Sequence, residues 1–287
     1  MAAAAPPSTL CAMRKHLVIA LVAVSALGAA CGRSTSSGTA AGADLPKELR
    51  VVTSEGYPPM EMYKPGTREL TGVDVDLAMA IGKRLGMRTT ITNAAFDGLI
   101  PGLQGGRWDL AMSSLSDTAQ RRQAVDFVDY FNAGGSIMVE KGNPEGIATL
   151  ADLCGRKVVL AKGSSNLDIG ERQNDKCPPG KKMDIMQSED APTGLLSIDS
   201  GRTVATIVDS PVAAMYAKET GKYEVLPEQY DAGPWGIAVA KRNTALRDSV
   251  AKALQELIDS GEYRAILDKY GTGANAVSKV TVNTGAP

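Results

Sequence analysis

The sequence predicts an α/β fold made of two similar units. Short β-rich runs alternate with segments of helical periodicity, and this alternation starts again near residue 157. An alternation of strands and helices favours a largely parallel sheet with helices on its faces. The chain has 287 residues, which is enough for two cores, because single cores usually stop growing by about 250–300 residues.

The first unit begins with LRVVTS at residues 49–54, a pattern typical of a buried strand. A helix is expected next in GVDVDLAMAIGKRLG, where Leu77, Ile81 and Leu85 form one apolar stripe and Gly86 ends the helix. The other expected elements are a strand at 89–93, a short helix at 96–106 and a strand at 109–114.

The second unit repeats the strand–helix pair three times. The expected strands lie at 157–163, 181–187 and 203–208, and the expected helices lie at 164–176, 191–201 and 210–221. The chain then finishes with a strand at 235–241 and a helix at 245–261. That helix has an apolar face made of Val250, Ala253, Leu254, Leu257 and Ile258. Stretches that contain glycine, NAGG at 132–135 and DAGP at 231–234, separate the two units.

An export signal is expected in residues 1–30. The basic run MRKH precedes the apolar stretch LVIALVAVSALGAA, which ends at Cys31. The residues before Cys31 resemble a bacterial lipobox, which implies that Cys31 is acylated and becomes the new N-terminus. An ordinary signal peptide cut near the same place is the alternative. Residues 31–46 are small and polar and are expected to form a flexible tether. The folded part would then lie outside the cytoplasm, held at the cell membrane by a lipid anchor.

The folded part contains two cysteines, Cys154 and Cys177, because Cys11 and Cys31 belong to the export region. Two cysteines in an exported protein favour one disulfide. Two separately buried thiols are the alternative.

The composition excludes several classes of function. The one histidine, His16, lies in the export signal, so the folded part lacks the base of Ser-His-Asp and Cys-His enzymes and the usual ligand of catalytic zinc. No nucleotide-binding glycine motif is present, and the formal net charge of −1 indicates no nucleic-acid partner. We therefore expect no metal and no cofactor.

The decapeptide SSLSDTAQRR at 113–122 follows an expected strand and is a candidate anion site. Ser114 and Ser116 alternate, so their hydroxyls would share one side of an extended segment. Thr118 is expected to cap a short helix, from which Arg121 could grip a carboxylate with two parallel hydrogen bonds. A plain helix cap with surface arginines is the alternative.

Other strand ends carry further candidates. Ser165 in KGSS lies at an expected helix start, where backbone N–H groups favour anions. Asp209 in IVDSP precedes Ser210 and Pro211, which already suit the helix start, so Asp209 could face an ammonium group. Tyr57 and Phe96 lie in two loops of the first unit and could flank a ligand side chain. The alternatives are a plain strand–helix turn at Ser165, a capping or surface role for Asp209, and core packing for Tyr57 and Phe96.

Taken in order, these stretches resemble the type II periplasmic solute-binding proteins of polar amino-acid ABC importers. The resemblance rests on SEGYPPME, LTGVDVDLAMAIGKRLG, FDGLIPGLQGGRWDLAMSSLSDT, KGSS, GRTVATIVDSPVAA and WGIAVAK. It implies a two-lobed fold with two mostly parallel sheets joined by a two-strand hinge. Lobe 1 would comprise 47–133 and 234–275, lobe 2 would comprise 134–233, and 276–287 would be a C-terminal tail.

The resemblance also implies roles for the candidate residues. Arg121 would bind the α-carboxylate of an amino acid with help from Ser116 and Ser165, and Asp209 would bind the α-ammonium with help from Ser114. Tyr57 and Phe96 would flank the side chain. Relatives that bind lysine or arginine often have an acid where this chain has Ser54, so a polar uncharged ligand such as glutamine is expected.

The expected function is therefore capture of an amino acid by lobe closure and delivery to an ABC permease, by a monomer that is not an enzyme. Two alternatives use the same fold. One is a lyase similar to cyclohexadienyl dehydratase, which needs a general acid for which Glu55 is the candidate. The other is a sensory module that docks on a membrane receptor.

Overall fold

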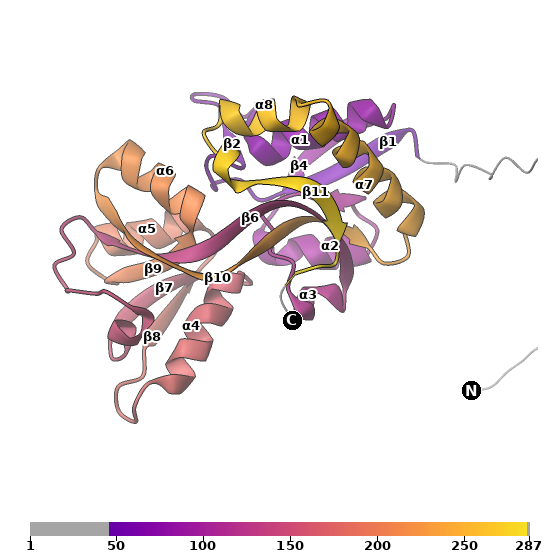
Figure 1. Ribbon diagram of the computed structural model, residues 1–287. Helices are drawn as coiled ribbons and strands as arrows, with labels where there is room; N and C mark the ends of the chain where they lie inside the picture. Colours follow the sequence, from indigo (N-terminus) through magenta and orange to yellow (C-terminus); the bar gives the residue numbers. More distant parts are fainter. Residues whose placement is uncertain (1–45, 286–287) are drawn as a thin grey trace, which may run out of the picture. The chain divides into compact units, whose positions relative to one another are not determined.

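The computed structural model describes residues 46–285, in which helices flank a mixed sheet (Figure 1). The α/β fold class is confirmed. The export signal, Cys31 and nearly all of the tether lie outside the described residues. Within residues 46–285, no helix combines the length and the apolar character needed to cross a bilayer.

The strands are β1 (Glu48–Thr53), β2 (Met62–Tyr63), β3 (Leu70–Thr71), β4 (Arg88–Asn93), β5 (Leu110–Ala111), β6 (Val125–Glu140), β7 (Lys157–Ala161), β8 (Asp184–Ser188), β9 (Ala205–Asp209), β10 (Tyr223–Ala240) and β11 (Ala276–Val282). The α-helices are α1 (Val73–Arg84), α2 (Leu99–Gln104), α3 (Ala119–Arg122), α4 (Ser165–Lys176), α5 (Ala191–Asp199), α6 (Ser210–Thr220), α7 (Thr244–Asp259) and α8 (Glu262–Lys269). The 3₁₀ turns are η1 (Phe96–Gly98), η2 (Leu150–Leu153) and η3 (Gly273–Asn275).

Nine of the described strands form one hydrogen-bonded sheet, in which two long strands join the two expected groups of parallel strands. Its order is β4-β1-β5-β10-β6-β9-β7-β8, with β11 added beside β6. The pairs β1–β4, β1–β5, β7–β8 and β7–β9 are parallel, as expected. The sheet is continuous because β6 and β10 are 16 and 18 residues long and pair antiparallel through both halves.

The expected hinge stretches, 132–135 and 231–234, lie inside the two long strands β6 and β10. Pairing between these two strands is irregular there, with register shifts on both sides of Tyr230. A Cβ at Gly135 would lie 2.2 Å from Asn166 Oδ1, so only glycine lets α4 approach β6 this closely. The lobe boundaries at 133/134 and 233/234 stay a prediction.

The sequence of α1 explains why this helix forms in the first half of the fold. Its apolar stripe buries Leu77 and Ile81. Acidic residues occupy its first turn and Lys83 and Arg84 its last turn, in accord with the helix dipole. Before it, Gly72 has φ 134° and a Cβ there would lie 2.0 Å from the Met60 carbonyl oxygen, so glycine brings the start of α1 against the loop at residues 57–61.

The expected helix at 96–106 is divided into η1 and α2, and it ends at Gly105, which is followed by a second glycine. The segment expected as a tail, 276–287, contains β11, which pairs with β6 and includes Val282 opposite Val128. Helix α8 follows α7 directly, and both pack against α1 (Figure 1).

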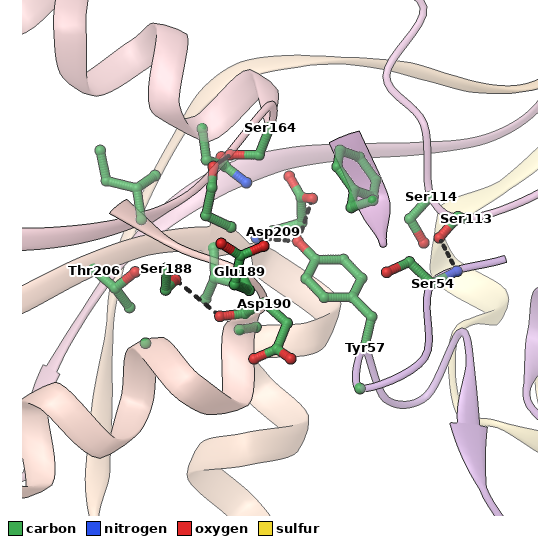
Figure 2. Close-up of a pocket in the computed structure, with 18 of the residues that line it drawn as sticks. Ser54, Tyr57, Ser113, Ser114, Ser164, Ser188, Glu189, Asp190, Thr206 and Asp209 are labelled. Atoms are coloured by element: carbon green, nitrogen blue, oxygen red, sulfur yellow. Dashed lines mark hydrogen bonds between the residues drawn. The ribbon is translucent and has the colours of Figure 1, made fainter. Parts of the chain in front are cut away.

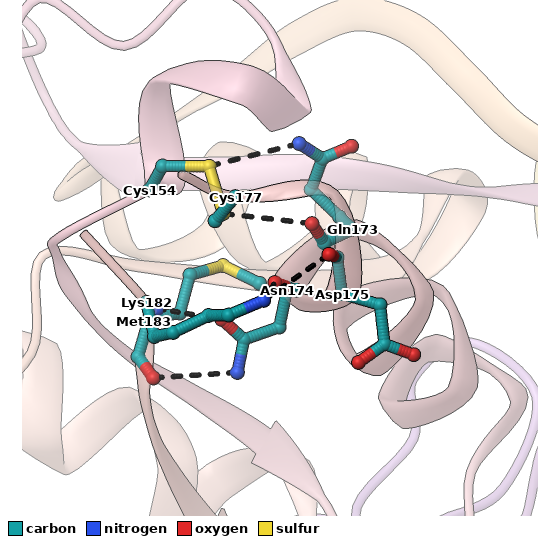
Figure 3. The surroundings of a disulfide bond; sticks show 7 residues. All are labelled: Cys154, Gln173, Asn174, Asp175, Cys177, Lys182 and Met183. Atoms are coloured by element: carbon teal, nitrogen blue, oxygen red, sulfur yellow. Dashed lines mark hydrogen bonds between the residues drawn. A yellow bond between two sulfur atoms is a disulfide. The ribbon is translucent and has the colours of Figure 1, made fainter. Parts of the chain in front are cut away.

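The expected disulfide joins Cys154 to Cys177 (Figure 3). The two Cα atoms are 5.5 Å apart, and each cysteine directly follows a helical segment, η2 or α4. The end of α4 is also fixed by Lys182, whose ammonium donates to the carbonyl oxygens of Asn174 and Asp175 at 2.7 and 3.1 Å. The disulfide therefore anchors one end of a helix whose other end carries Ser165.

Candidate ligand-binding site

One cavity lies where the carboxyl ends of parallel strands from both halves of the sheet meet (Figure 2). Its walls come from the ends of β1, β4 and β5 in the first half and of β7, β8 and β9 in the second. Ligands of open α/β sheets bind at such strand ends. The predicted site residues that line this cavity are Tyr57, Phe96, Ser114, Arg121, Ser165 and Asp209.

Arg121 belongs to the short helix α3, and Thr118 caps that helix as predicted, by accepting the Arg121 N–H at 3.2 Å. The guanidinium donates to the carbonyl oxygens of Ser116 and Gly163, each at 3.0 Å. It also lies over the Phe96 ring, 5.6 Å from the ring centroid. A guanidinium has about five N–H donors, and the two carbonyl oxygens accept only two of these hydrogen bonds. The remaining N–H groups are available to an anion.

Asp209 ends β9 and is 6% exposed. Its carboxylate accepts a hydrogen bond from the Tyr57 hydroxyl at 2.5 Å. Burial raises the pKa of Asp209, while hydrogen bonds from Tyr57 and Asn166 and the charge of Arg121 lower that pKa. Asp209, not the expected Ser210, holds the N-cap position of α6, yet its side chain makes no capping hydrogen bond. The carboxylate is therefore directed to the cavity instead of to the helix.

Ser114 and Ser116 of the decapeptide do not share one side, contrary to expectation. Ser114 lines the cavity, whereas Ser116 lines a neighbouring groove and contacts Ser165, with 2.9 Å between the two hydroxyl oxygens. The physical reason is the backbone of Ser114, which is left-handed with φ 49° and so interrupts the extended alternation. Ser116 still contributes to the site, since its carbonyl oxygen holds Arg121.

Four acidic residues line the cavity and were not assigned to ligand binding by the sequence analysis, although Glu55 was its candidate general acid for the lyase alternative. They are Glu55, Glu61, Glu189 and Asp190. Burial, and to a smaller degree the charge of Asp190, raise the pKa of Glu55. Glu189 and Asp190 directly follow β8, so the strand-end argument that identified Asp209 could have found them. Asp190 also caps α5 by accepting the Thr193 N–H at 2.8 Å.

Further cavity residues have polar groups on the second half of the sheet. Ser164 caps α4 through the Leu167 N–H. Tyr216 of α6 donates its hydroxyl to the Gly56 carbonyl oxygen at 2.7 Å, which ties α6 to the loop after β1. The local sequence did not predict Tyr216 as a site residue, because it lies in the middle of a helix with no motif around it.

Comparison with known proteins identifies the family. The profile of the bacterial extracellular solute-binding proteins, family 3, matches residues 49–273. The arginine-binding extracellular protein of Bacillus subtilis is 31% identical over 265 residues, which cover 91% of this chain and 99% of the relative. The histidine-binding periplasmic protein of Salmonella typhimurium is 31% identical over 243 residues, covering 82% and 92%. These names describe binding proteins, not enzymes, as the sequence analysis predicts.

Solved structures agree with this assignment. An ancestral arginine-binding protein bound to arginine superposes with a TM-score of 0.74 at 33% identity, covering 79% of this chain and 99% of that one. An ancestral arginine-binding protein bound to glutamine gives a TM-score of 0.73, also at 33% identity. The family profile spans most of the described residues, and the cavity lies within that span. The chain belongs to the bacterial extracellular solute-binding proteins of family 3.

Proposed function

We propose that the protein binds one free α-amino acid in this cavity and delivers it to the permease of an ABC importer. The observation that carries the proposal is the pair Arg121 and Asp209, which bring one positive and one negative charge to the same cavity from different halves of the sheet. An amino acid is a zwitterion and needs both. The names of the relatives, which are amino-acid-binding proteins, support this assignment.

The carboxylate of the ligand would bind Arg121 and the first N–H groups of α4 near Ser165. These backbone donors have no partner inside the helix, and the helix dipole favours an anion beside them. The ammonium would donate to Asp209 and to the oxygen atoms of Ser114. The Tyr57 hydroxyl already donates to Asp209, so the ammonium would complete the hydrogen bonding of this carboxylate.

We propose a cationic side chain for the ligand, with arginine as the first candidate. The sequence alone favours glutamine, because Ser54 replaces an acid. Glu55 follows Ser54 in the chain and lines the cavity. Glu189 and Asp190 line the same cavity (Figure 2). These acids supply negative charge from neighbouring positions. Glutamine remains the second candidate, since structures of ancestral arginine-binding proteins hold either amino acid.

A ligand panel tests the proposal. Residues 32–287 would be stripped of bound ligand by unfolding and refolding and then titrated with each common amino acid by calorimetry. A ligand at one hundred times its Kd adds roughly 2.7 kcal/mol of stability, so a thermal shift gives an independent readout. We expect arginine to bind most tightly. Tighter binding of glutamine would reverse the side-chain proposal, and no binding of any amino acid by folded protein would refute the function.

We also propose that Cys31 carries the lipid anchor that holds this receptor outside the cytoplasm. The supporting observation is the basic and apolar signal before Cys31. Cys31→Ala should shift the protein from the membrane fraction to the soluble fraction and remove label from a radioactive fatty acid. Retention of the label would show that the lipid is attached elsewhere. We further propose a monomer, for which light scattering should give the mass of one chain.

A further inference from the structure

Two carboxyl groups lie buried at the cavity, one in its wall and one behind it. Glu61 follows the loop that carries Tyr57, and Asp74 lies in the first turn of α1; each residue is 1% exposed. Within residues 46–285, no lysine or arginine forms an ion pair with either of them. Burying two unpaired negative charges side by side is costly, so the charge state of this pair needs an explanation.

The hydrogen bonds assign different states to the two groups. Asp74 accepts from the Tyr130 hydroxyl at 2.5 Å and from the Ser114 N–H at 2.8 Å. Both partners are donors, which suits an ionised carboxylate. Glu61 accepts the Ser113 hydroxyl through Oε1 at 2.9 Å, but its Oε2 has no donor among the described residues. The backbone brings the two residues together, because the Asp74 N–H donates to the carbonyl oxygen of Met60, next to Glu61, at 3.0 Å. The two carboxyl groups also bind consecutive residues, Ser113 and Ser114.

We propose that Glu61 is protonated at neutral pH, that it donates this proton in a hydrogen bond to Asp74, and that the pair positions the ligand-binding loops. A proton on Oε2 of Glu61 lets this oxygen donate a hydrogen bond to Asp74. The pair then carries one negative charge, on Asp74, instead of two. The positioning role rests on the amino-acid-binding function proposed above, whereas the shared proton does not.

The pair reaches three segments of the cavity wall. Asp74 holds the N–H of Ser114 in its left-handed conformation. Glu61 holds the Ser113 hydroxyl, which in turn accepts the Ser54 N–H at 3.0 Å (Figure 2). The backbone of Glu61 also forms a two-way bridge with Tyr57, at 2.9 and 3.2 Å. The strand ends after β1 and β5 are thereby fixed to one buried unit.

The electrostatics of the surroundings support this assignment. Burial and then the charge of Asp74 raise the pKa of Glu61 well above its usual range, and the more distant Asp209 adds to this rise. Burial also raises the pKa of Asp74, but hydrogen bonds from Glu61, Tyr130 and Ser114 lower it. Asp74 is therefore the better anion of the two. The other titratable groups nearby are phenols of raised pKa, Tyr57 and Tyr130, which stay neutral.

The proton is tested directly by infrared spectroscopy in D₂O at neutral pH. We expect a carbonyl stretching band from a protonated carboxyl group in the wild type, its loss in Glu61→Gln, and its retention in Glu256→Gln. Glu256 is an exposed residue of α7 and serves as the matched control. An identical spectrum for Glu61→Gln would overturn the protonated state.

The positioning role is tested by affinity for L-arginine and L-glutamine. The amide introduced by Glu61→Gln would accept from Ser113 and donate to Asp74, as the acid does, so this variant should bind within about threefold of the wild type. Glu61→Leu and Asp74→Asn should each weaken binding by roughly tenfold or more, about 1.4 kcal/mol, with circular dichroism showing folded protein. Wild-type affinity in folded Glu61→Leu would refute positioning. Absence of binding in the wild type would refute the proposed function and leave the infrared result standing.

Discussion

Arg121 and Asp209 differ in how their charges are balanced before any ligand binds. Arg121 donates to two carbonyl oxygens and lies over an aromatic ring, none of which carries a negative charge. Asp209 accepts the neutral hydroxyl of Tyr57. Neither charge is paired within 4 Å to an opposite side-chain charge among the described residues. Each is therefore available to a ligand, and each can be tested separately.

Arg121→Ala should abolish detectable binding, with a loss of at least roughly 100-fold in affinity. Two hydrogen bonds between charged groups would be lost, and each contributes about 1.5–3 kcal/mol. Calorimetry measures the effect, and Arg68→Ala is a matched control because Arg68 is exposed and does not line the cavity. Affinity within threefold of the wild type would contradict the carboxylate role.

Asp209→Asn should weaken binding by roughly tenfold or more, because a buried ammonium would lose its counter-charge. The same change should stabilise the empty protein at neutral pH. The folded-state pKa of Asp209 is raised, so its stabilising contribution is present below the unfolded pKa and is lost as pH rises through the folded pKa.

Melting curves from pH 3 to pH 8 test this second effect. We expect the melting temperature of the empty Asp209→Asn variant to exceed that of the wild type above the raised pKa and to converge with it in acid. The opposite order at neutral pH would mean that Tyr57 and Asn166 already stabilise the charged form more than burial opposes it.

At the scale of elements, the disulfide is placed to stabilise the second half of the sheet. It closes a separation of 23 residues between η2 and the end of α4. In the chain-entropy description, a disulfide that closes a loop of this size stabilises the folded protein by about 3 kcal/mol. The double change Cys154→Ser and Cys177→Ser should therefore lower the free energy of unfolding by about 2–4 kcal/mol, measured in urea.

The same variant should keep its affinity within a fewfold at low temperature, because neither cysteine lines the cavity. Ser165 lies at the opposite end of α4, twelve residues before Cys177 on a continuous helix. A large loss of affinity with unchanged stability would show instead that the disulfide positions the N-terminus of α4.

Most elements of this fold are predictable from local pattern. The strands β1, β4, β7 and β9 and the helices α1, α4, α6 and α7 follow alternation, caps and terminal glycines, which are properties of neighbouring residues. β11 could not be predicted in this way, since its burial is mixed and it exists only through pairing with β6. The continuity of β6 and β10 depends likewise on long-range pairing.

The candidate site divides in the same way. Arg121, Asp209 and Ser165 follow strands, so the strand-end rule finds them. The separation of Ser116 from Ser114 depends on one left-handed residue held by Asp74, and sequence alone does not show that contact. The pairing of Glu61 with Asp74 joins a loop to a helix thirteen positions away. No sequence motif around either residue predicts that the two carboxyl groups share a proton.

At the scale of the whole described region, β6 and β10 join the two halves of the sheet, and polar contacts around the cavity add to this connection. Tyr216 donates to the Gly56 carbonyl oxygen at 2.7 Å, and Lys162 forms an ion pair with Asp97 at 2.7 Å. Ion pairs and single hydrogen bonds near solvent contribute little, typically up to about 1 kcal/mol each. We therefore propose that the halves separate when the cavity is empty and close when an amino acid supplies charges for Arg121 and Asp209.

Small-angle scattering tests closure. L-Arginine should reduce the radius of gyration of the wild type, whereas Arg121→Ala should show no change at the same concentration. Lys162→Ala is the informative second variant, because it removes a contact between the halves without removing a ligand contact. The empty Lys162→Ala variant should be more open than the empty wild type. Its affinity for arginine should fall only slightly, because closing the two halves would require only a little more free energy than in the wild type. A radius that stays constant in every variant would mean that the cavity fills without movement of the halves.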